Sequence, residues 1–275
     1  MDSKSLDELQ LAVIEEAEKN HGKKEEKYHF DKMKLFFGEP HVVHEIKINQ
    51  PTIGDILDVG WRSFSSAISP FISNSTSIRL MLWNMGEKNW CKISDIEVYN
   101  ILTQNLNLDQ SGIKILFPEK TLTDYKLVKY TDKNDQSKFG LYNQKVDDLI
   151  TDDEYMEIAE FIRTVTNIHP KVEHSTSKIA RKWMIQEDQM NLVNKKQDSD
   201  YTGILPVVSA LTNYPGFKYK LEELRQVNLY RFYDAAQRVQ IYEQTRALMN
   251  GSYSGFADLS KVDKDLFNFM RAINQ

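Results

Sequence analysis

The segment TDDEYMEIAEFI, residues 151–162, decides the fold class because a helix starts here directly after a region of strand character. Thr151 and Glu154 form a capping box, in which each side chain accepts a hydrogen bond from the backbone amide of the other residue. Apolar side chains then recur at helical spacing, at Tyr155, Ile158, Ala159 and Ile162. We expect this helix to stop near His169-Pro170, because a proline disfavours helical backbone in the residue before it.

Two regions before this helix predict strands. In the first, residues 34–37 and 42–48 read as two strands joined by the turn Gly38-Glu-Pro40, and together they predict a small hairpin. The second region predicts three short strands with alternating or aromatic side chains, at residues 113–117, 126–130 and 139–142. Residues 132–135 supply a polar turn between the last two of these strands.

Three more helices are expected in the first half of the chain. Thr52 follows Pro51 as an N-cap and starts an amphipathic helix whose apolar face holds Ile53, Ile56, Leu57, Trp61 and Phe64. Ser94 and Glu97 form a second capping box, which starts a helix with one face made of Ile96, Tyr99, Leu102 and Leu106. The short apolar run of residues 78–85 predicts the third helix.

The chain after Pro170 reads as helical. Residues 177–196 predict a helix with an apolar stripe of Ile179, Trp183, Met190 and Val193. The polar residues 195–200 predict a linker. Three helices should follow: one over residues 204–212, a short one with Leu221, Leu224 and Val227, and a longer one that ends at Gly251. The tail predicts one more helix, carried by Leu266, Met270 and Ile273.

These elements predict an α+β protein that is predominantly α-helical, with a small N-terminal antiparallel β region among helices and a helical C-terminal region. We expect a loosely attached acidic helix in residues 1–30 and a mixed α/β domain in residues 31–170. A helix and linker should occupy residues 171–200, and a helical C-terminal domain residues 201–275. No internal repeat of 20 to 50 residues is visible, which argues against a solenoid.

Composition limits the class of protein. The chain has 275 residues, 41% hydrophobic and 27% charged, which is typical of a soluble globular protein. Its net charge of −5 provides no overall basic field for a nucleic-acid backbone. The single cysteine, Cys91, excludes an internal disulfide and a thiolate-rich zinc site, so a reducing cytoplasm is expected. The N-terminus is acidic where an export signal would be basic, and the longest charge-free stretch is too polar to span a membrane.

No motif predicts catalysis, a cofactor or a metal. His41 and His44 are three residues apart on a predicted strand, so their side chains should point to opposite faces and not share one ion. None of the 11 glycines lies in a phosphate-binding loop pattern. Gly251-Ser-Tyr-Ser-Gly255 has Tyr253 where a hydrolase elbow needs its nucleophile. Cys91 reads as a buried structural thiol. The motifs therefore predict no catalytic residue, no cofactor site and no metal site.

Aromatic residues are dense in the last third of the chain, and arginines lie among them. Such side chains are usually core, but Tyr and Trp also anchor protein interfaces. The arginines could pair with phosphates, although neighbouring acids such as Glu222 and Asp234 cancel much of that field. A helix of a partner protein is the favoured ligand.

Three stretches of the chain resemble tail assembly chaperones of tailed bacteriophages, in particular the long form found in phages and prophages of Gram-positive hosts. They are FFGEPHVVHEIKINQPTIGDIL (36–57), IRLMLWNMGEKNWCKISDIEVYNIL (78–102) and YPGFKYKLEELRQVNLYRFYDAAQRVQIYEQTRALMNGSYSG (214–255). The resemblance implies a role without catalysis in the host cytoplasm. Such a protein binds the helical tape measure protein and aids assembly of the tail tube protein. Self-association of this chain is left open.

The resemblance places the partner-binding site in the C-terminal helical region, with candidate residues Tyr230, Phe232, Tyr233, Arg238, Tyr242 and Arg246. Each aromatic among them could instead close the core of its own domain. Two other functions stay open. One is a virion structural protein, such as a tail or connector subunit, and the other is a nucleic-acid-binding factor or an enzyme that acts during infection.

Overall fold

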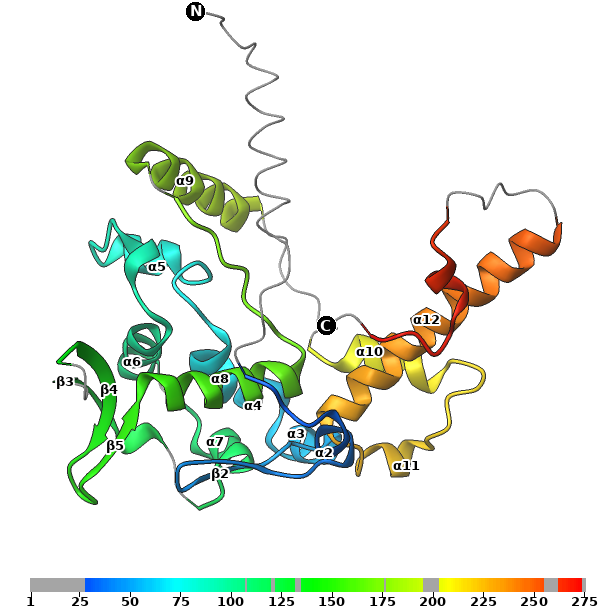
Figure 1. Cartoon of the computed structure of the whole chain (residues 1–275), viewed down its shortest axis with the longest axis horizontal. Coiled ribbons are helices and arrows are strands. Elements are labelled where there is room, and N and C mark those ends of the chain that lie inside the picture. Colours follow the sequence, from blue (N-terminus) through cyan, green and yellow to red (C-terminus); the bar gives the residue numbers. More distant parts are fainter. Residues whose placement is uncertain are drawn as a thin grey trace, which may run out of the picture. The chain divides into compact units, whose positions relative to one another are not determined.

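The computed structural model describes residues 28–106, 108–119, 122–131, 135–175, 177–194, 203–254 and 262–273. The chain divides into two compact units, Met1–Phe30 and Asp31–Gln275. All helices and strands below belong to the second unit (Figure 1). Two small antiparallel sheets accompany helices that hold far more residues than the strands do. The predicted α+β, mainly helical class is therefore confirmed. The helix expected before residue 28 lies outside the described residues, and the division of residues 31–275 into three parts stays a prediction.

The first elements are α2 (Lys32–Phe37) and a hairpin of β1 (His41–Val43) and β2 (Ile46–Ile48). The hairpin that we expected, with strands at residues 34–37 and 42–48, is wrong, because residues 34–37 are helical. The observed hairpin lies, except for His41, within the second of these expected strands, which turns back at His44 and Glu45. Asp31 caps α2 by accepting hydrogen bonds from the amides of Met33 and Lys34. Gly38, with φ of 79°, ends it in the left-handed region, where glycine carries no steric penalty.

A capping box between Thr52 and Asp55 starts α3 (Ile53–Val59), as the N-cap prediction required. The single amphipathic helix that we expected here is two helices, because Gly60 has φ of 84° and separates α3 from α4 (Trp61–Ile72). Phe64 is buried on α4, whereas Leu57 is exposed on α3. The break at Gly60 allows α4 to run in a different direction from α3 and to bury Phe64 in the core.

The next elements are α5 (Arg79–Asn84), the 3-10 turn η1 (Trp90–Lys92) and α6 (Asp95–Asn105). The predicted Ser94–Glu97 capping box is present. The expectation of a strand over residues 113–117 is wrong, since α7 (Gln110–Leu116) is a helix capped by Asp109. Gly112 lets α7 approach α4 closely, because a Cβ on Gly112 would lie 2.7 Å from the Ser63 carbonyl oxygen.

The second sheet has strand order β3-β4-β5 and is fully antiparallel. It follows the 3-10 turn η2 (Leu122–Asp124) and consists of β3 (Lys126–Thr131), β4 (Ser137–Asn143) and β5 (Asp148–Thr151). The first two strands confirm the sequence prediction, and β5 was not predicted. The polar turn expected at 132–135 falls mostly on residues outside the described ones.

The core forms where α8 (Asp152–Thr166) packs against α4 and α6 (Figure 1). Its capping box between Thr151 and Glu154 is as predicted, and the helix ends at Asn167, which has a left-handed backbone. An aromatic cluster fills the space between the three helices and α7, and its members are Phe71, Tyr99, Phe117 and Tyr155.

The remaining elements are helical: α9 (Lys178–Asn194), α10 (Leu205–Thr212), α11 (Leu221–Leu224), α12 (Leu229–Ser254) and the 3-10 turn η3 (Lys264–Phe267). The predicted end of the long helix at Gly251 is three residues early, and the helix expected in the tail is a 3-10 turn. The linker expected at 195–200 lies outside the described residues. In the described part of the chain, no helix has the length and apolar character that a membrane span requires.

Candidate partner-binding surface

Backbone hydrogen bonds fix the start of α12 to the start of α3. The Leu229 amide donates to the Pro51 carbonyl at 2.8 Å, and the Ile53 amide donates to the Val227 carbonyl at 3.0 Å. The Gly54 amide donates to the Arg225 carbonyl at 2.9 Å, and a Cβ on Gly54 would lie 2.8 Å from that oxygen. The long helix therefore leaves the body of the protein in a defined direction.

The first turns of α12 contain three of the predicted partner-binding residues. Phe232 is 0% exposed and Tyr230 is buried, so both side chains pack inside the protein. Tyr233 is half-buried against the ring of Phe232, with ring centroids 5.8 Å apart, and burial raises the pKa of its phenol. A partner cannot reach Phe232 in this conformation, which leaves the later turns of α12 as the accessible part.

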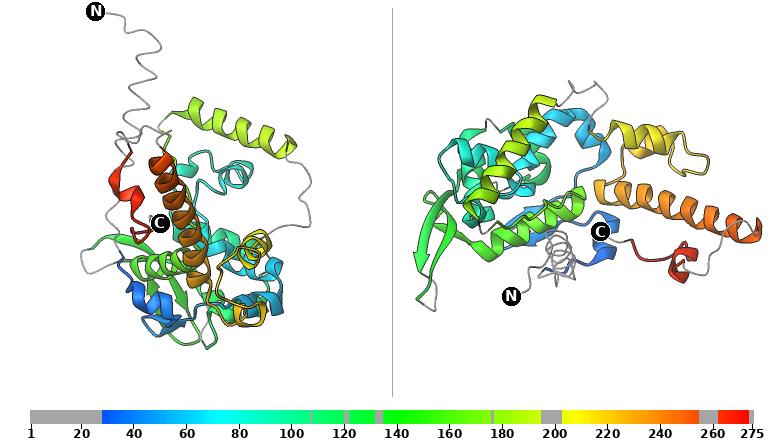
Figure 2. Two further views of the ribbon diagram at one scale, coloured as in Figure 1. Left: turned by 90° about the vertical axis from the view of Figure 1, so that its right-hand side faces the viewer. Right: turned by 90° about the horizontal axis from the view of Figure 1, so that it is seen from above.

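Arg238 holds another segment of the same chain. Its Nη1 donates to the carbonyl oxygens of Phe269 and Arg271 at 3.0 and 2.9 Å. Thr245 adds a hydrogen bond from Oγ1 to the Leu266 carbonyl at 3.0 Å. Residues 262–273 therefore lie along one side of α12, as both views in Figure 2 show. The guanidinium of Arg238 therefore binds carbonyl groups of its own chain, not of a partner.

The last turns of α12 present an exposed stripe, which we call the α12 face. It consists of Tyr242, Arg246, Met249 and Tyr253, spaced by four, three and four residues, so that the side chains follow one another along the helix. Tyr242 is 51% exposed and Tyr253 is 88% exposed. This spacing is that of a helix surface which packs against a second helix.

Phe269 and Met270 extend the apolar surface beside the α12 face. Both side chains are exposed, and the ring of Phe269 packs edge-on against Tyr242 with centroids 6.1 Å apart. Residues 262–273 therefore contribute apolar area next to the helix. Exposed contiguous apolar surface of this kind marks interaction sites on soluble proteins.

The charged groups near the α12 face are largely paired with one another. The Arg246 guanidinium lies 3.8 Å from the Glu243 carboxylate. The Tyr214 hydroxyl donates a hydrogen bond to the same carboxylate, which raises the pKa of Tyr214. Further back on the helix, burial raises the pKa of Asp234, and the nearby Arg238 partly offsets this. The face thus has one exposed cation among apolar side chains.

The structure brings together only two of the six predicted residues, Tyr242 and Arg246, on this exposed face. Sequence reasoning did not select Met249 and Tyr253. Their positions seven and eleven residues after Tyr242 were a sufficient signal, because such residues share a helix face with it.

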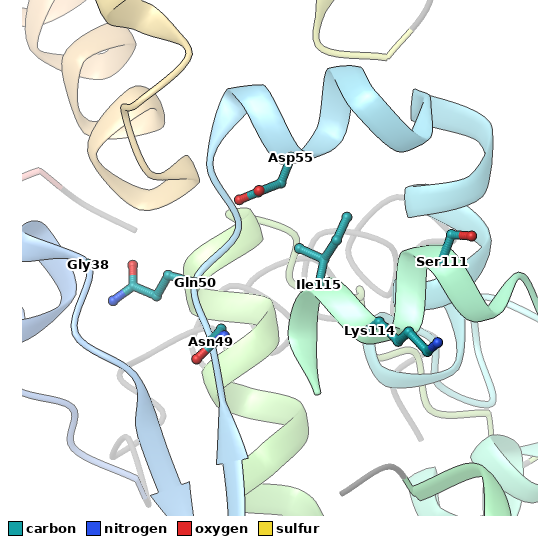
Figure 3. A pocket seen from close by; sticks show the side chains of 7 residues that line it. All are labelled: Gly38, Asn49, Gln50, Asp55, Ser111, Lys114 and Ile115. Atoms are coloured by element: carbon teal, nitrogen blue, oxygen red, sulfur yellow. The ribbon is translucent and has the colours of Figure 1, made fainter. Parts of the chain in front are cut away.

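The hollow shown in Figure 3 offers no convergent set of binding groups. It has a volume of about 370 Å³ and is lined by Gly38, Asn49, Gln50, Asp55, Ser111, Lys114 and Ile115. Asp55 is used by the capping box, and the Gln50 Nε2 donates to the Glu39 carbonyl. Ser111 and Lys114 extend away from Gln50 (Figure 3). We therefore place the candidate site on the α12 face.

The two histidines singled out from sequence contact different carboxylates. His41 Nε2 lies 2.8 Å from Glu157, and its ring stacks on Phe161. His44 lies in the turn after β1, with φ of 54°, and its two ring nitrogens contact Glu154 and Asp148. His44 is therefore not on the strand where we expected it. Over the residues that have described positions, no group of three His, Cys, Asp or Glu side chains could hold a metal ion.

Cys91 is half-buried, and its thiol points to the Ser175 carbonyl at 3.8 Å. This thiol is more exposed than the buried structural thiol that we expected. The contact joins η1 to the segment that precedes α9.

Comparison with known proteins gives no match: no family model matches the chain, and neither a curated protein nor a solved structure is significantly similar to it. The assignment of function therefore depends on the α12 face and on the sequence resemblance described above.

Proposed function

We propose that this protein is a phage tail assembly chaperone that binds the tape measure protein in the host cytoplasm and aids assembly of the tail tube. The observation that carries the proposal is the α12 face, an exposed apolar stripe at helix-packing spacing on a helix whose start is fixed in the protein core. The resemblance of three sequence stretches to such chaperones supports the same function.

The chemistry of the α12 face suits a helical partner. Tape measure proteins are long and helical and expose apolar stripes before the tube encloses them. Tyr242 and Tyr253 supply large side chains with a polar tip, which anchor interfaces without requiring a fully dry site. A helix laid along this stripe buries its own apolar side chains against them.

The fixed start of α12 and the net charge of the chain both suit a chaperone. The start of α12 is held by backbone hydrogen bonds, so little conformational entropy is lost when a partner binds. The net charge of −5 keeps this protein away from neutrality and favours its own solubility. Binding of this kind makes and breaks no covalent bond.

The test is coexpression of the full chain with the tape measure protein of the same phage. We expect the chain to rescue the solubility of the tape measure protein and to copurify with it. The double variant Tyr242→Ala/Tyr253→Ala should lose most of this capture while its thermal unfolding changes little, because Tyr253 is almost fully exposed and Tyr242 is half exposed.

A matched control is Tyr219→Ala, which also replaces a tyrosine in the C-terminal region but lies off the α12 face. It should leave capture intact. Capture that survives in the double variant would place the binding surface elsewhere, and no rescue by the unaltered chain would contradict the proposed function. Stoichiometric amounts of the protein in purified virions would favour the virion structural alternative.

A further inference from the structure

Within the residues that the structure describes, helix α9 contacts the rest of the protein through one face. Ile185 is buried, and the guanidinium of Arg79 in α5 donates two hydrogen bonds, of 2.6 and 2.7 Å, to the carboxylate of Asp188. Arg79 also pairs with Glu173 in the segment before α9. On the same side, Arg181 donates to the Asn89 side chain at 3.0 Å. Figure 1 and the views in Figure 2 show α9 lying beside α5.

The opposite face of α9 is an exposed apolar seam. Its apolar members are Ile179, Trp183, Met190 and Val193, which are between 65% and 85% exposed, and Gln186 lies between them. The spacing through Gln186 is four, three, four and three residues. This is the spacing of a coiled-coil seam, in which Trp183 and Met190 would take a positions and the other three residues d positions.

The residues beside the seam carry opposite charges in the order that a parallel pair requires. In the register set by the seam, Lys182 occupies a g position and Glu187 the following e position. In a parallel coiled coil, a g residue of one helix faces the e residue five positions later on the other helix. Two copies of α9 would thus form two Lys182–Glu187 pairs.

We propose that α9 pairs in register and in parallel with α9 of a second copy of this chain. Each apolar seam residue then packs against its own counterpart. Gln186 lies opposite Gln186 of the second copy. Each side-chain amide can donate a hydrogen bond to the other and accept one from it. A single polar position in such a seam fixes the register of the pair.

The charges distinguish this arrangement from the antiparallel one. In an antiparallel pair, g positions face g positions and e positions face e positions. Lys182 would then lie on the side of Gln189, and Glu187 on the side of Ala180, so no opposite charges would meet. The seam is therefore complementary to itself in the parallel direction.

The docking of α9 on α5 also lowers the cost of pairing. An isolated helix of this length is marginal in water, because nucleation is costly. Here Arg79 and Ile185 already hold the helix in place, so it is ordered before it meets a second copy. The pairing face is separate from the α12 face, and it does not depend on the proposed chaperone function.

The test is sedimentation equilibrium of the full chain over a range of concentrations. We expect a monomer–dimer equilibrium. Trp183→Glu should raise the dimer dissociation constant by at least about tenfold, since it buries a charge in the seam. The side chain is exposed in the single chain, so circular dichroism and unfolding of the variant should be unchanged. A chain that stays monomeric at all concentrations would overturn the proposal.

Charge reversal tests the parallel register without altering the seam. Lys182→Glu and Glu187→Lys each create two like-charge pairs in the dimer, so each variant alone should dimerise at least about tenfold more weakly. When the two variants are mixed, every pair is again of opposite charge, and a heterodimer should form at close to the original affinity. Failure of the mixture to associate better than either variant would contradict the parallel arrangement.

A cysteine crosslink gives an independent reading of direction. In a Cys91→Ser background, Val193→Cys should form a disulfide between two copies on mild oxidation, because equivalent d positions lie side by side in a parallel pair. Lys178→Cys, at an exposed position off the seam of the same helix, is the matched control and should crosslink far less. Equal crosslinking of the two variants would count against pairing through the seam.

Discussion

Arg163 of α8 donates a hydrogen bond of 2.7 Å from Nη2 to the carboxylate of Asp95, the first residue of α6. The same guanidinium donates to the carbonyl oxygens of Phe71 and Ser73, at the end of α4. One buried side chain therefore joins three helices, and it satisfies carbonyl groups that a helix leaves without partners at its C-terminus.

Replacement of Arg163 should be among the most destabilising single changes in the core. Arg163→Met keeps a long side chain but leaves Asp95 and the two carbonyl groups without their donor, so the free energy of unfolding should fall by about 3–5 kcal/mol. Urea denaturation measures this. Glu160→Gln removes the more exposed partner of the same guanidinium and should cost less than about 1 kcal/mol. Equal losses in the two variants would contradict the bridging role.

Gly112 should not tolerate a methyl group. A Cβ at this position would lie 2.7 Å from the Ser63 carbonyl oxygen and 2.9 Å from the Ala67 Cβ, so Gly112→Ala must push α7 away from α4. We expect a loss of about 1–3 kcal/mol in the free energy of unfolding, despite the higher helix propensity of alanine. Gln110→Ala, on the exposed side of the same helix, is the control and should be close to neutral. A stabilised Gly112→Ala variant would show that the helices can separate without cost.

Phe232 and Tyr253 should behave differently although both are aromatic residues of α12. Phe232 is fully buried, so Phe232→Ala should lower the free energy of unfolding by about 3–5 kcal/mol. Tyr253→Ala should change it by no more than about 0.5 kcal/mol, because the ring is almost entirely in solvent. Thermal or chemical unfolding of the two variants checks this, and comparable losses would mean that the end of α12 is packed.

Acid should weaken the attachment of the segment before α9. Hydrogen bonds and charge from Lys171 and then Arg79 hold the pKa of Glu173 below its usual value. A depressed carboxyl pKa contributes stability that is present above the ordinary glutamate pKa and is lost as the pH falls through the lowered value. The chain should therefore lose stability over this acidic range.

Glu173→Gln tests that linkage. The variant should have a smaller dependence of unfolding free energy on pH between the ordinary glutamate pKa and the lower pKa of the folded state. Lys171→Met should reduce the dependence in part, because it removes the larger cause of the shift. An unchanged pH dependence in Glu173→Gln would show that other carboxyl groups carry the acid sensitivity.

Sequence reasoning located the helix starts that local chemistry determines. Thr52, Ser94 and Thr151 each cap a helix together with an acid three residues later, and such pairs act within one turn of backbone. The apolar runs at 34–37 and 113–117 were misassigned as strands, because a run of four or five residues has no distinguishing period. Their helical state depends on Asp31, Gly38 and Asp109 at the ends.

The candidate site was predicted only in part, for a tertiary reason. The periodicity of α12 shows which side chains share a face, but it does not show where the helix leaves the core. Phe232 and Tyr242 both lie on the apolar positions of one helix, yet Phe232 is fully buried, whereas Tyr242 is half exposed beside Phe269. On α9, by contrast, the sequence predicted every residue of the apolar stripe, and all of them are exposed in the structure.

The hydrogen bonds between residues 51–54 and 225–229 have a consequence for biosynthesis. Translation is vectorial, so Pro51, Ile53 and Gly54 leave the ribosome well before Arg225, Val227 and Leu229, which complete their backbone pairing. Until the later residues are synthesised, the amides of Ile53 and Gly54 and the carbonyl of Pro51 have only water as a substitute for these partners. Release of the chain before codon 225 would yield a polypeptide in which the start of α3 never gains its native partners.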